Sequence, residues 1–152
     1  MIVCKFGGTS VQDAAAITRL ARIVAERRAE HPLVVVSALA KVTDGLLRLG
    51  ETVRLGDAGA INDALDALLQ RHDAVASALP GGEMALPALQ EDVATLRDRM
   101  QAARGRALAP AERDFLLGQG EIWSSRVVAA ALEGVGLHAE WFDVRQVMVT
   151  DD

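Results

Sequence analysis

Apolar residues gather early in the chain into two short continuous runs, at residues 1–6 and 33–37. The second run, LVVVS, is typical of a strand that is covered on both faces of a parallel sheet. Between them, residues 11–29 repeat apolar side chains at helical spacing. Ser10 is expected to cap this helix, with Asp13 as its capping-box partner. Residues 1–37 therefore predict a strand–helix–strand unit with parallel strands.

Helical periodicity dominates the rest of the chain. Three stretches show it: residues 43–79, residues 87–104 and residues 110–133. Gly56 and Gly59 predict a break within the first stretch, and residues 118–120, Gly-Gln-Gly, predict an irregularity within the third. Residues 137–142 predict a third strand. The fold class is therefore α/β, with few parallel strands and long helices.

Composition and charge narrow the class of protein. The 152 residues are 51% hydrophobic and 24% charged, which is a globular composition. A net charge of −5 without a basic stripe argues against nucleic acid as a partner. No run is long enough to predict a membrane span, and the single cysteine, Cys4, excludes an internal disulfide and fits a reducing compartment. We therefore expect a cytoplasmic protein that binds neither membranes nor nucleic acid.

The first candidate site follows Lys5, which ends the first strand. Gly7 and Gly8 come next and allow the backbone to approach a ligand closely or to adopt positive φ. Thr9 and Ser10 add hydroxyl donors before the N-terminus of a helix, a position that suits a phosphate group. The Lys5 ammonium could offset the negative charge on a transferring phosphoryl group. An ordinary strand–turn–helix explains the same residues, so this segment alone leaves both interpretations open.

Two further segments contain candidate chemistry. Ser37 and Thr43 follow the second strand, at the sheet edge where ligands bind in open α/β sheets. A helix cap by itself also explains Thr43. Glu121 lies inside an apolar helix, where a carboxylate needs a partner such as a ligand ammonium or Arg126, unless it occupies an exposed face. The histidines, at positions 31, 72 and 138, are scattered and predict no metal cluster or catalytic triad.

Together these segments resemble the aspartate kinases, members of the amino-acid kinase family. Four motifs match in the same order and at similar spacing: residues 5–11 (KFGGTSV), Ser37 with Thr43, Gly120 with Glu121, and residues 141–145 (WFDVR). The last motif is most similar to lysine-sensitive forms, some of which are fused to a second biosynthetic enzyme. The resemblance covers essentially the whole chain.

The resemblance implies a three-layer αβα fold of the carbamate kinase type and a definite reaction. Aspartate kinases transfer phosphate from ATP, with Mg²⁺, to L-aspartate and form 4-phospho-L-aspartate, the first step of lysine, threonine and methionine biosynthesis. The attacking carboxylate, with a pKa of about 4, is already ionised and needs no general base. A homo-oligomer is the expected assembly.

Roles for individual residues follow from the matching positions. Lys5 would be the catalytic residue that stabilises the transferring phosphoryl group. The residues implied to surround the phosphates are Lys5, Gly7, Gly8, Thr9 and Ser10. Those implied to hold aspartate are Ser37, Thr43 and Glu121, with Glu121 facing the ammonium group. The resemblance assigns no metal ligand within this chain.

Aspartate kinases continue well beyond the position of residue 152, with the nucleotide-binding half of the sheet and usually with regulatory ACT domains. We therefore expect residues 1–152 to be the N-terminal, substrate-binding part of the catalytic domain. Such a fragment should be inactive by itself and should bind neither ATP nor Mg²⁺ tightly.

Two alternatives stay open. One is another amino-acid kinase, which phosphorylates glutamate, acetylglutamate or a nucleotide. The other is a non-catalytic binding module or a subunit of a heteromeric assembly, because an open sheet edge favours pairing with another chain.

Overall fold

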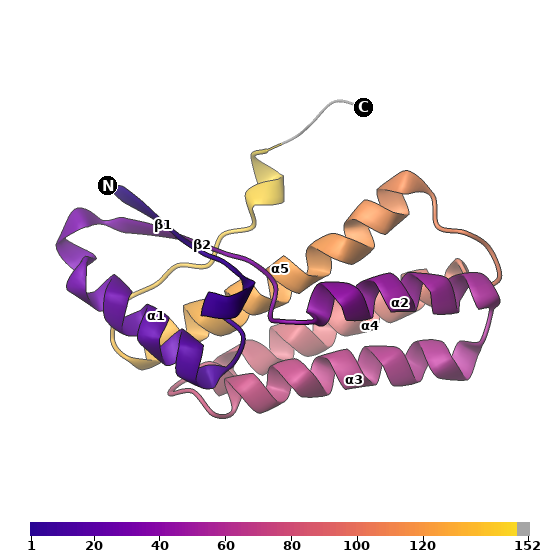
Figure 1. The fold of residues 1–152 in the computed structure, drawn as a ribbon, viewed down its shortest axis with the longest axis horizontal. Coiled ribbons are helices and arrows are strands. Elements are labelled where there is room, and N and C mark those ends of the chain that lie inside the picture. Colours follow the sequence, from indigo (N-terminus) through magenta and orange to yellow (C-terminus); the bar gives the residue numbers. More distant parts are fainter. Residues whose placement is uncertain (149–152) are drawn as a thin grey trace.

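A computed structural model of this chain describes residues 1–148. The fold begins with two parallel strands. β1 (Ile2–Phe6) and β2 (Pro32–Val36) pair with Ile2 opposite Pro32 and Phe6 opposite Val36. Both predicted strands are confirmed, each within one residue of the expected bounds. Because the strands are parallel and in register, the segments that follow Phe6 and Val36 leave the sheet at the same edge (Figure 1).

The helix between the strands begins later than predicted. α1 spans Ala14–Glu26, and the Asp13 carboxylate accepts a hydrogen bond from the Ala16 amide at 2.7 Å. Asp13 is therefore the N-cap, and the prediction that Ser10 caps this helix is wrong. Ser10 instead ends a short 3-10 turn, η1 (Gly8–Ser10), in which its amide donates to the Gly7 carbonyl. A second 3-10 turn, η2 (Arg28–Glu30), leads into β2.

Four long helices form the larger part of the molecule (Figure 1). They are α2 (Val42–Leu55), α3 (Ala58–Ala76), α4 (Leu86–Ala102) and α5 (Pro110–Gly134), with a 3-10 turn η3 (Gly82–Ala85) before α4. The predicted break between the first two is confirmed: Gly56 ends α2 with φ of 83°, and the Asp57 side chain caps α3. Large side chains that are almost fully buried between these helices include Leu46, Leu49, Leu65, Leu96, Leu116 and Trp123.

α5 runs without interruption for 25 residues, so the predicted irregularity at residues 118–120 is wrong. The glycine at position 120 has a packing role instead. A Cβ atom on Gly120 would lie 2.9 Å from the Ala38 Cβ and 3.2 Å from the Val42 Cγ1. Only glycine therefore lets α5 approach the segment that joins β2 to α2 so closely.

The predicted third strand is also wrong, because residues 137–142 have no strand pairing. Side chains hold this extended segment against α5: the Trp141 Nε1–H donates to the Ser125 Oγ at 2.8 Å. A 3-10 turn, η4 (Val144–Gln146), follows. The α/β class with few parallel strands and long helices is confirmed. Within residues 1–148, no helix combines the length and apolar character that a membrane crossing requires.

One face of the two-stranded sheet packs against the helices and the other is open. Phe6, Val34 and Val36 are partly buried and contact the core. On the opposite face, Val3 and Leu33 expose 62% and 53% of their surface. The helical packing therefore covers a single side of the sheet in the part of the chain that is described.

Candidate functional site

The candidate site lies at the carboxyl edge of the sheet, where two loops emerge together. The Ser37 amide donates to the Phe6 carbonyl at 3.0 Å, so the Lys5 segment and the Ser37 segment are direct neighbours. A Cβ atom on Gly8 would lie 3.5 Å from the Ala38 carbonyl oxygen. The expectation that these two loops are adjacent is confirmed.

The glycines after Lys5 are not required by the backbone or by packing. Gly7 is extended, with φ of −76° and ψ of 174°, and neither Gly7 nor Gly8 adopts positive φ. A Cβ atom on Gly7 would meet only the Lys5 ammonium nitrogen, at 3.6 Å. The positive-φ explanation for these residues is therefore wrong. The backbone of this loop is bare beside the Lys5 ammonium, which leaves room for a ligand to approach it closely.

Thr9 and Ser10 complete this loop, and both are exposed. Lys5 is exposed as well and belongs to the outward face of the sheet. The loop thus presents an ammonium group, two hydroxyl groups and a backbone without side chains. These groups can bind a phosphate without being buried among the helices.

Thr43 is the second residue of α2 and does not cap it. The N-cap position belongs to Lys41, which adopts a left-handed conformation with φ of 67° and makes no side-chain capping bond. The explanation of Thr43 as a plain helix cap is therefore wrong. Its side chain is exposed next to the first amides of the helix, which have no partner within the helix itself. Thr43 can therefore contact a ligand at the end of β2.

A buried serine joins the Ser37 segment to α5. The Ser124 hydroxyl donates to the Ser37 carbonyl at 2.8 Å and lies 3.1 Å from the Glu121 carbonyl. Both of these residues were predicted to hold substrate, whereas Ser124 was not singled out from the sequence. The only sequence signal for it is a serine one helical turn after Gly120.

Glu121 lies on an exposed part of α5, in a groove beside the end of β2. The groove has a volume of about 840 Å³ and lies between β2, α5 and residues 137–148. Its lining is mainly apolar and includes Val36, Ile122 and Trp141. Glu121 therefore offers an accessible carboxylate beside an apolar wall, in a groove whose lining includes none of Lys5, Ser37 and Thr43.

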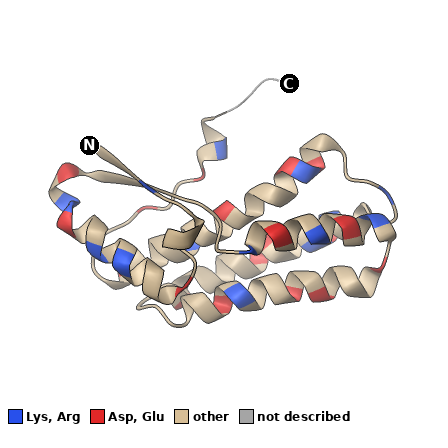
Figure 2. Cartoon of the chain, viewed as in Figure 1, with Lys and Arg blue, Asp and Glu red and all other residues tan. Residues whose placement is uncertain are grey.

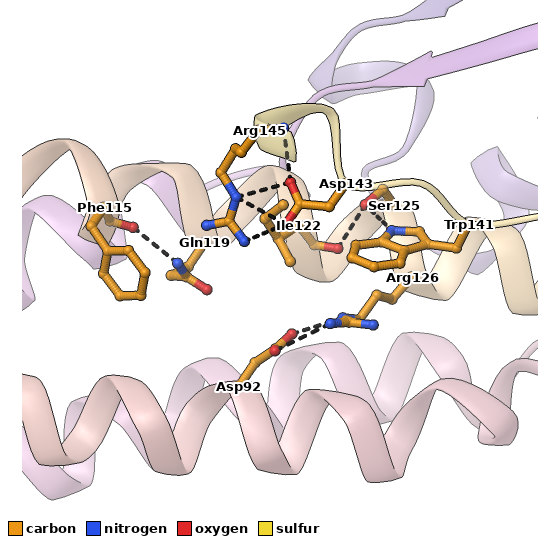
Figure 3. Close-up of polar contacts among 9 residues, drawn as sticks. All are labelled: Asp92, Phe115, Gln119, Ile122, Ser125, Arg126, Trp141, Asp143 and Arg145. Carbon is orange, nitrogen blue, oxygen red and sulfur yellow. Dashed lines mark hydrogen bonds and ion pairs between the residues drawn. The ribbon is translucent and has the colours of Figure 1, made fainter. Parts of the chain in front are cut away.

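Arg126 does not pair with Glu121, which corrects one of the partners considered for that carboxylate. Its guanidinium donates to the Asp92 carboxylate at 2.8 Å and stacks 3.9 Å from the centroid of the Trp141 ring (Figure 3). Asp143 and Arg145 form a second pair, at 2.6 Å, and Arg145 holds the pKa of the Asp143 carboxyl below its usual range. The stacking of Arg126 on Trp141 connects the WFDVR segment to α5, whereas the Asp143–Arg145 pair lies within the segment itself.

Acidic and basic residues are interspersed along the helices (Figure 2). This distribution fits the net charge of −5 and does not favour a nucleic-acid partner. Among residues 1–148, no group of three or more His, Cys, Asp or Glu side chains is placed to hold a metal ion.

Comparison with known proteins connects this geometry to one family. Residues 1–151 match the amino acid kinase family. The chain is 36% identical over 97% of its length to the chloroplastic bifunctional aspartokinase/homoserine dehydrogenase 1 of Arabidopsis thaliana, and 35% identical over 100% of its length to the lysine-sensitive aspartokinase 3 of Escherichia coli. The structure of E. coli aspartokinase III in complex with aspartate and ADP aligns over 100% of this chain with a TM-score of 0.86 and 33% identity.

The chain spans only part of these relatives. It covers 16% of the Arabidopsis protein, 33% of the E. coli lysine-sensitive enzyme and 33% of the chain in the E. coli structure.

Proposed function

Because the chain belongs to the amino acid kinase family, we propose that it is the substrate-binding part of an aspartate kinase. The reaction is transfer of the γ-phosphoryl group of ATP to the side-chain carboxylate of L-aspartate. One observation carries the proposal: two loops and one helix bring Lys5, Ser37 and the helical turn of Glu121 to one edge of the sheet.

The Lys5 loop is proposed to hold the phosphates of ATP. The bare backbone of Gly7 and Gly8 leaves room for phosphate oxygens, and the ammonium of Lys5 is on the same side as this opening. Thr9 and Ser10 add hydroxyl donors. When bound, ATP supplies the transferable phosphoryl group, and Lys5 offsets the negative charge that gathers on its oxygens.

Aspartate is proposed to bind between Ser37, Thr43 and Glu121. The exposed Glu121 carboxylate suits the substrate ammonium, and the two hydroxyl groups suit its carboxylates. The reacting carboxylate is ionised at neutral pH because the pKa of a free aspartate side chain is about 4. It needs no general base, so the residues at this edge serve to orient the nucleophile rather than to remove a proton from it.

We assign no ligand of Mg²⁺ to residues 1–148, among which no group of three or more His, Cys, Asp or Glu side chains is placed to hold a metal ion. We propose that residues 1–152 form the N-terminal part of a catalytic domain, with the nucleotide-binding half and any regulatory ACT domain supplied by further sequence. The share of each relative that the chain covers supports this division. A homo-oligomer and a cytoplasmic compartment are proposed on the family resemblance and on the single cysteine.

The proposal is tested by titrating the chain with L-aspartate in a calorimeter. The parent chain should bind L-aspartate, and Glu121→Gln should weaken binding by roughly tenfold or more, because a charge-assisted contact to the ammonium is lost. Glu133→Gln, an exposed carboxylate further along α5, is the matched control and should leave the affinity unchanged.

Parallel titrations with L-glutamate and N-acetyl-L-glutamate separate aspartate kinase from the other amino-acid kinases. Tighter binding of either compound than of L-aspartate would overturn the proposed substrate. Equal loss of affinity in Glu121→Gln and Glu133→Gln would overturn the role of Glu121.

A further inference from the structure

We propose that Ser124 is a positioning residue, which holds the Ser37 segment against α5 and thereby sets the separation between Ser37 and Glu121. The inference rests on the proposed function, because both residues are proposed there to contact L-aspartate. Ser124 itself is fully buried, with 0% of its surface exposed, and so acts through these two neighbours.

The hydrogen bonds of Ser124 connect elements that are far apart in the sequence. Its hydroxyl donates across 87 residues of sequence to the Ser37 carbonyl at 2.8 Å, and the Glu121 carbonyl lies 3.1 Å away on its own helix. A buried serine in a helix is usually satisfied by the preceding turn alone. The half-buried Ser125 makes such a bond, since its hydroxyl donates to the Ile122 carbonyl at 2.7 Å, and it also accepts from the Trp141 Nε1–H. Because a hydroxyl has a single proton, the two carbonyls compete for it or share it, and the shorter contact is the one to Ser37.

A second contact, one helical turn away, reinforces the first. Gly120 and Ser124 are four residues apart and therefore share one face of α5. At Gly120 the helix approaches Ala38 and Val42 so closely that a Cβ atom would come within 2.9 Å and 3.2 Å of their side chains. This face of α5 therefore fits the segment after β2 by a close packing contact at one turn and by a hydrogen bond at the next.

The position of Glu121 depends on this fit because it directly follows Gly120 in the helix. A shift of α5 along the segment would change the distance between Glu121 and Ser37. A substrate whose ammonium contacts one of them and whose carboxylate contacts the other is sensitive to that distance. Ser124 should therefore influence affinity for the amino acid although it is itself out of the ligand's reach.

The test compares Ser124→Ala with Ser125→Ala in the complete chain. Each variant removes one hydroxyl group from α5 together with one tertiary hydrogen bond, to Ser37 or to Trp141 respectively. Two quantities are measured: the Kd for L-aspartate by calorimetry, and the rate of amide hydrogen exchange in residues 38–42 by NMR. Ser124→Ala should weaken binding and accelerate exchange, each by roughly three- to tenfold, as expected for the loss of one hydrogen bond. Ser125→Ala should leave the exchange rate in residues 38–42 unchanged, because its tertiary bond is to Trp141 and not to Ser37.

Three results would overturn the inference: unchanged exchange in Ser124→Ala, unchanged affinity in Ser124→Ala, or an equal acceleration of exchange in both variants. If the parent chain does not bind L-aspartate, the proposed function fails, and the exchange measurement still decides whether Ser124 holds the segment. Ser124→Cys is nearly isosteric but a weak donor, and it repeats the comparison if the alanine variant does not fold.

Discussion

The indole ring of Trp123 on α5 meets the imidazole of His72 on α3 edge to face, with the ring centroids 5.3 Å apart and the planes at 80°. Each residue exposes only 1% of its surface. The His72 Nδ1 donates to the Leu68 carbonyl at 2.7 Å, whereas its Nε2 and the Trp123 Nε1 have no hydrogen-bond partner among residues 1–148. Burial lowers the pKa of His72 to about 4, partly opposed by the bond to Leu68.

This contact predicts a loss of stability in mild acid. Because the pKa of His72 is lower in the folded state (about 4) than its ordinary value of 6.5, the unfolded chain binds the proton first as the pH falls. The stabilisation is complete above pH 6.5 and is lost progressively as the pH falls to 4, by up to about 3 kcal/mol. Urea denaturation at pH 7.5 and at pH about 4.5 measures the difference.

Two variants test the assignment to His72. His72→Phe should flatten the pH dependence of the free energy of unfolding between pH 6.5 and pH 4.5. His31→Asn should retain that dependence; His31 is exposed and has φ of 50°, which asparagine tolerates. A slope in His72→Phe equal to that of the parent would contradict the prediction. The comparison is made above pH 4.5 so that Glu112 does not contribute to the pH dependence. The bidentate pair with Arg106 lowers the pKa of Glu112 to about 2, and the stability that this pair contributes is therefore lost only at lower pH.

A second prediction concerns the glycines beside Lys5. Gly7→Ala and Gly8→Ala should each change the free energy of unfolding by less than about 1 kcal/mol, because neither position has positive φ and the nearest atoms leave room for a methyl group. In an enzyme that joins this segment to an intact nucleotide-binding half, the same changes should reduce kcat/KM for ATP by roughly tenfold or more. Denaturation and steady-state kinetics measure the two effects. Large destabilisation with normal kinetics would show that these glycines serve the fold instead.

Two glycines of α5 should respond in opposite directions. A Cβ atom on Gly134 would overlap the Pro80 carbonyl, so Gly134→Ala should destabilise the chain by roughly 1–3 kcal/mol. Gly118 has open space around it, and Gly118→Ala should stabilise the chain by about 0.5–1 kcal/mol through helix propensity. Thermal unfolding of the two variants measures the difference, and a stabilised Gly134→Ala would contradict the close contact with the Pro80 turn.

The last prediction compares two ion pairs. Asp92 and Arg126 expose only 20% and 23% of their side chains, and Arg126 also stacks on Trp141. Asp92→Ala should therefore cost roughly 2 kcal/mol, because it leaves a partly buried guanidinium without its carboxylate. Asp66 pairs with Arg97 but exposes 56% of its side chain, and Asp66→Ala should cost less than about 1 kcal/mol. Urea denaturation ranks the two variants, and equal losses would count against burial as the cause.

Local patterns in the sequence were sufficient for most elements. β1, β2 and the four long helices follow apolar periodicity, which reports the face that each element buries. The break at Gly56 was predictable because a left-handed C-cap favours glycine. The sequence predicted the start of α1 too early, because Ser10 and Asp13 are both residue types that cap helices. The choice between them depends on which side chain reaches a free amide, and in the structure the Asp13 carboxylate reaches that of Ala16.

Tertiary contacts determined the remaining features. An apolar run such as residues 137–142 becomes a strand only if another strand supplies backbone partners, and in the described structure α5 holds this segment through side chains instead. Gly118 and Gly120 have similar sequence surroundings, yet only Gly120 is required by packing, because only Gly120 faces Ala38.

The sequence by itself determined which residue types follow each strand, and hence the kind of chemistry that the sheet edge can perform. It could not determine that Ser37, Glu121 and Ser124 meet, because Ser37 and Ser124 are separated by 87 residues and no local pattern encodes their hydrogen bond. That meeting depends on the approach of α5 to the segment after β2. The approach is set by the close contact at Gly120, which exists only once the helices are packed.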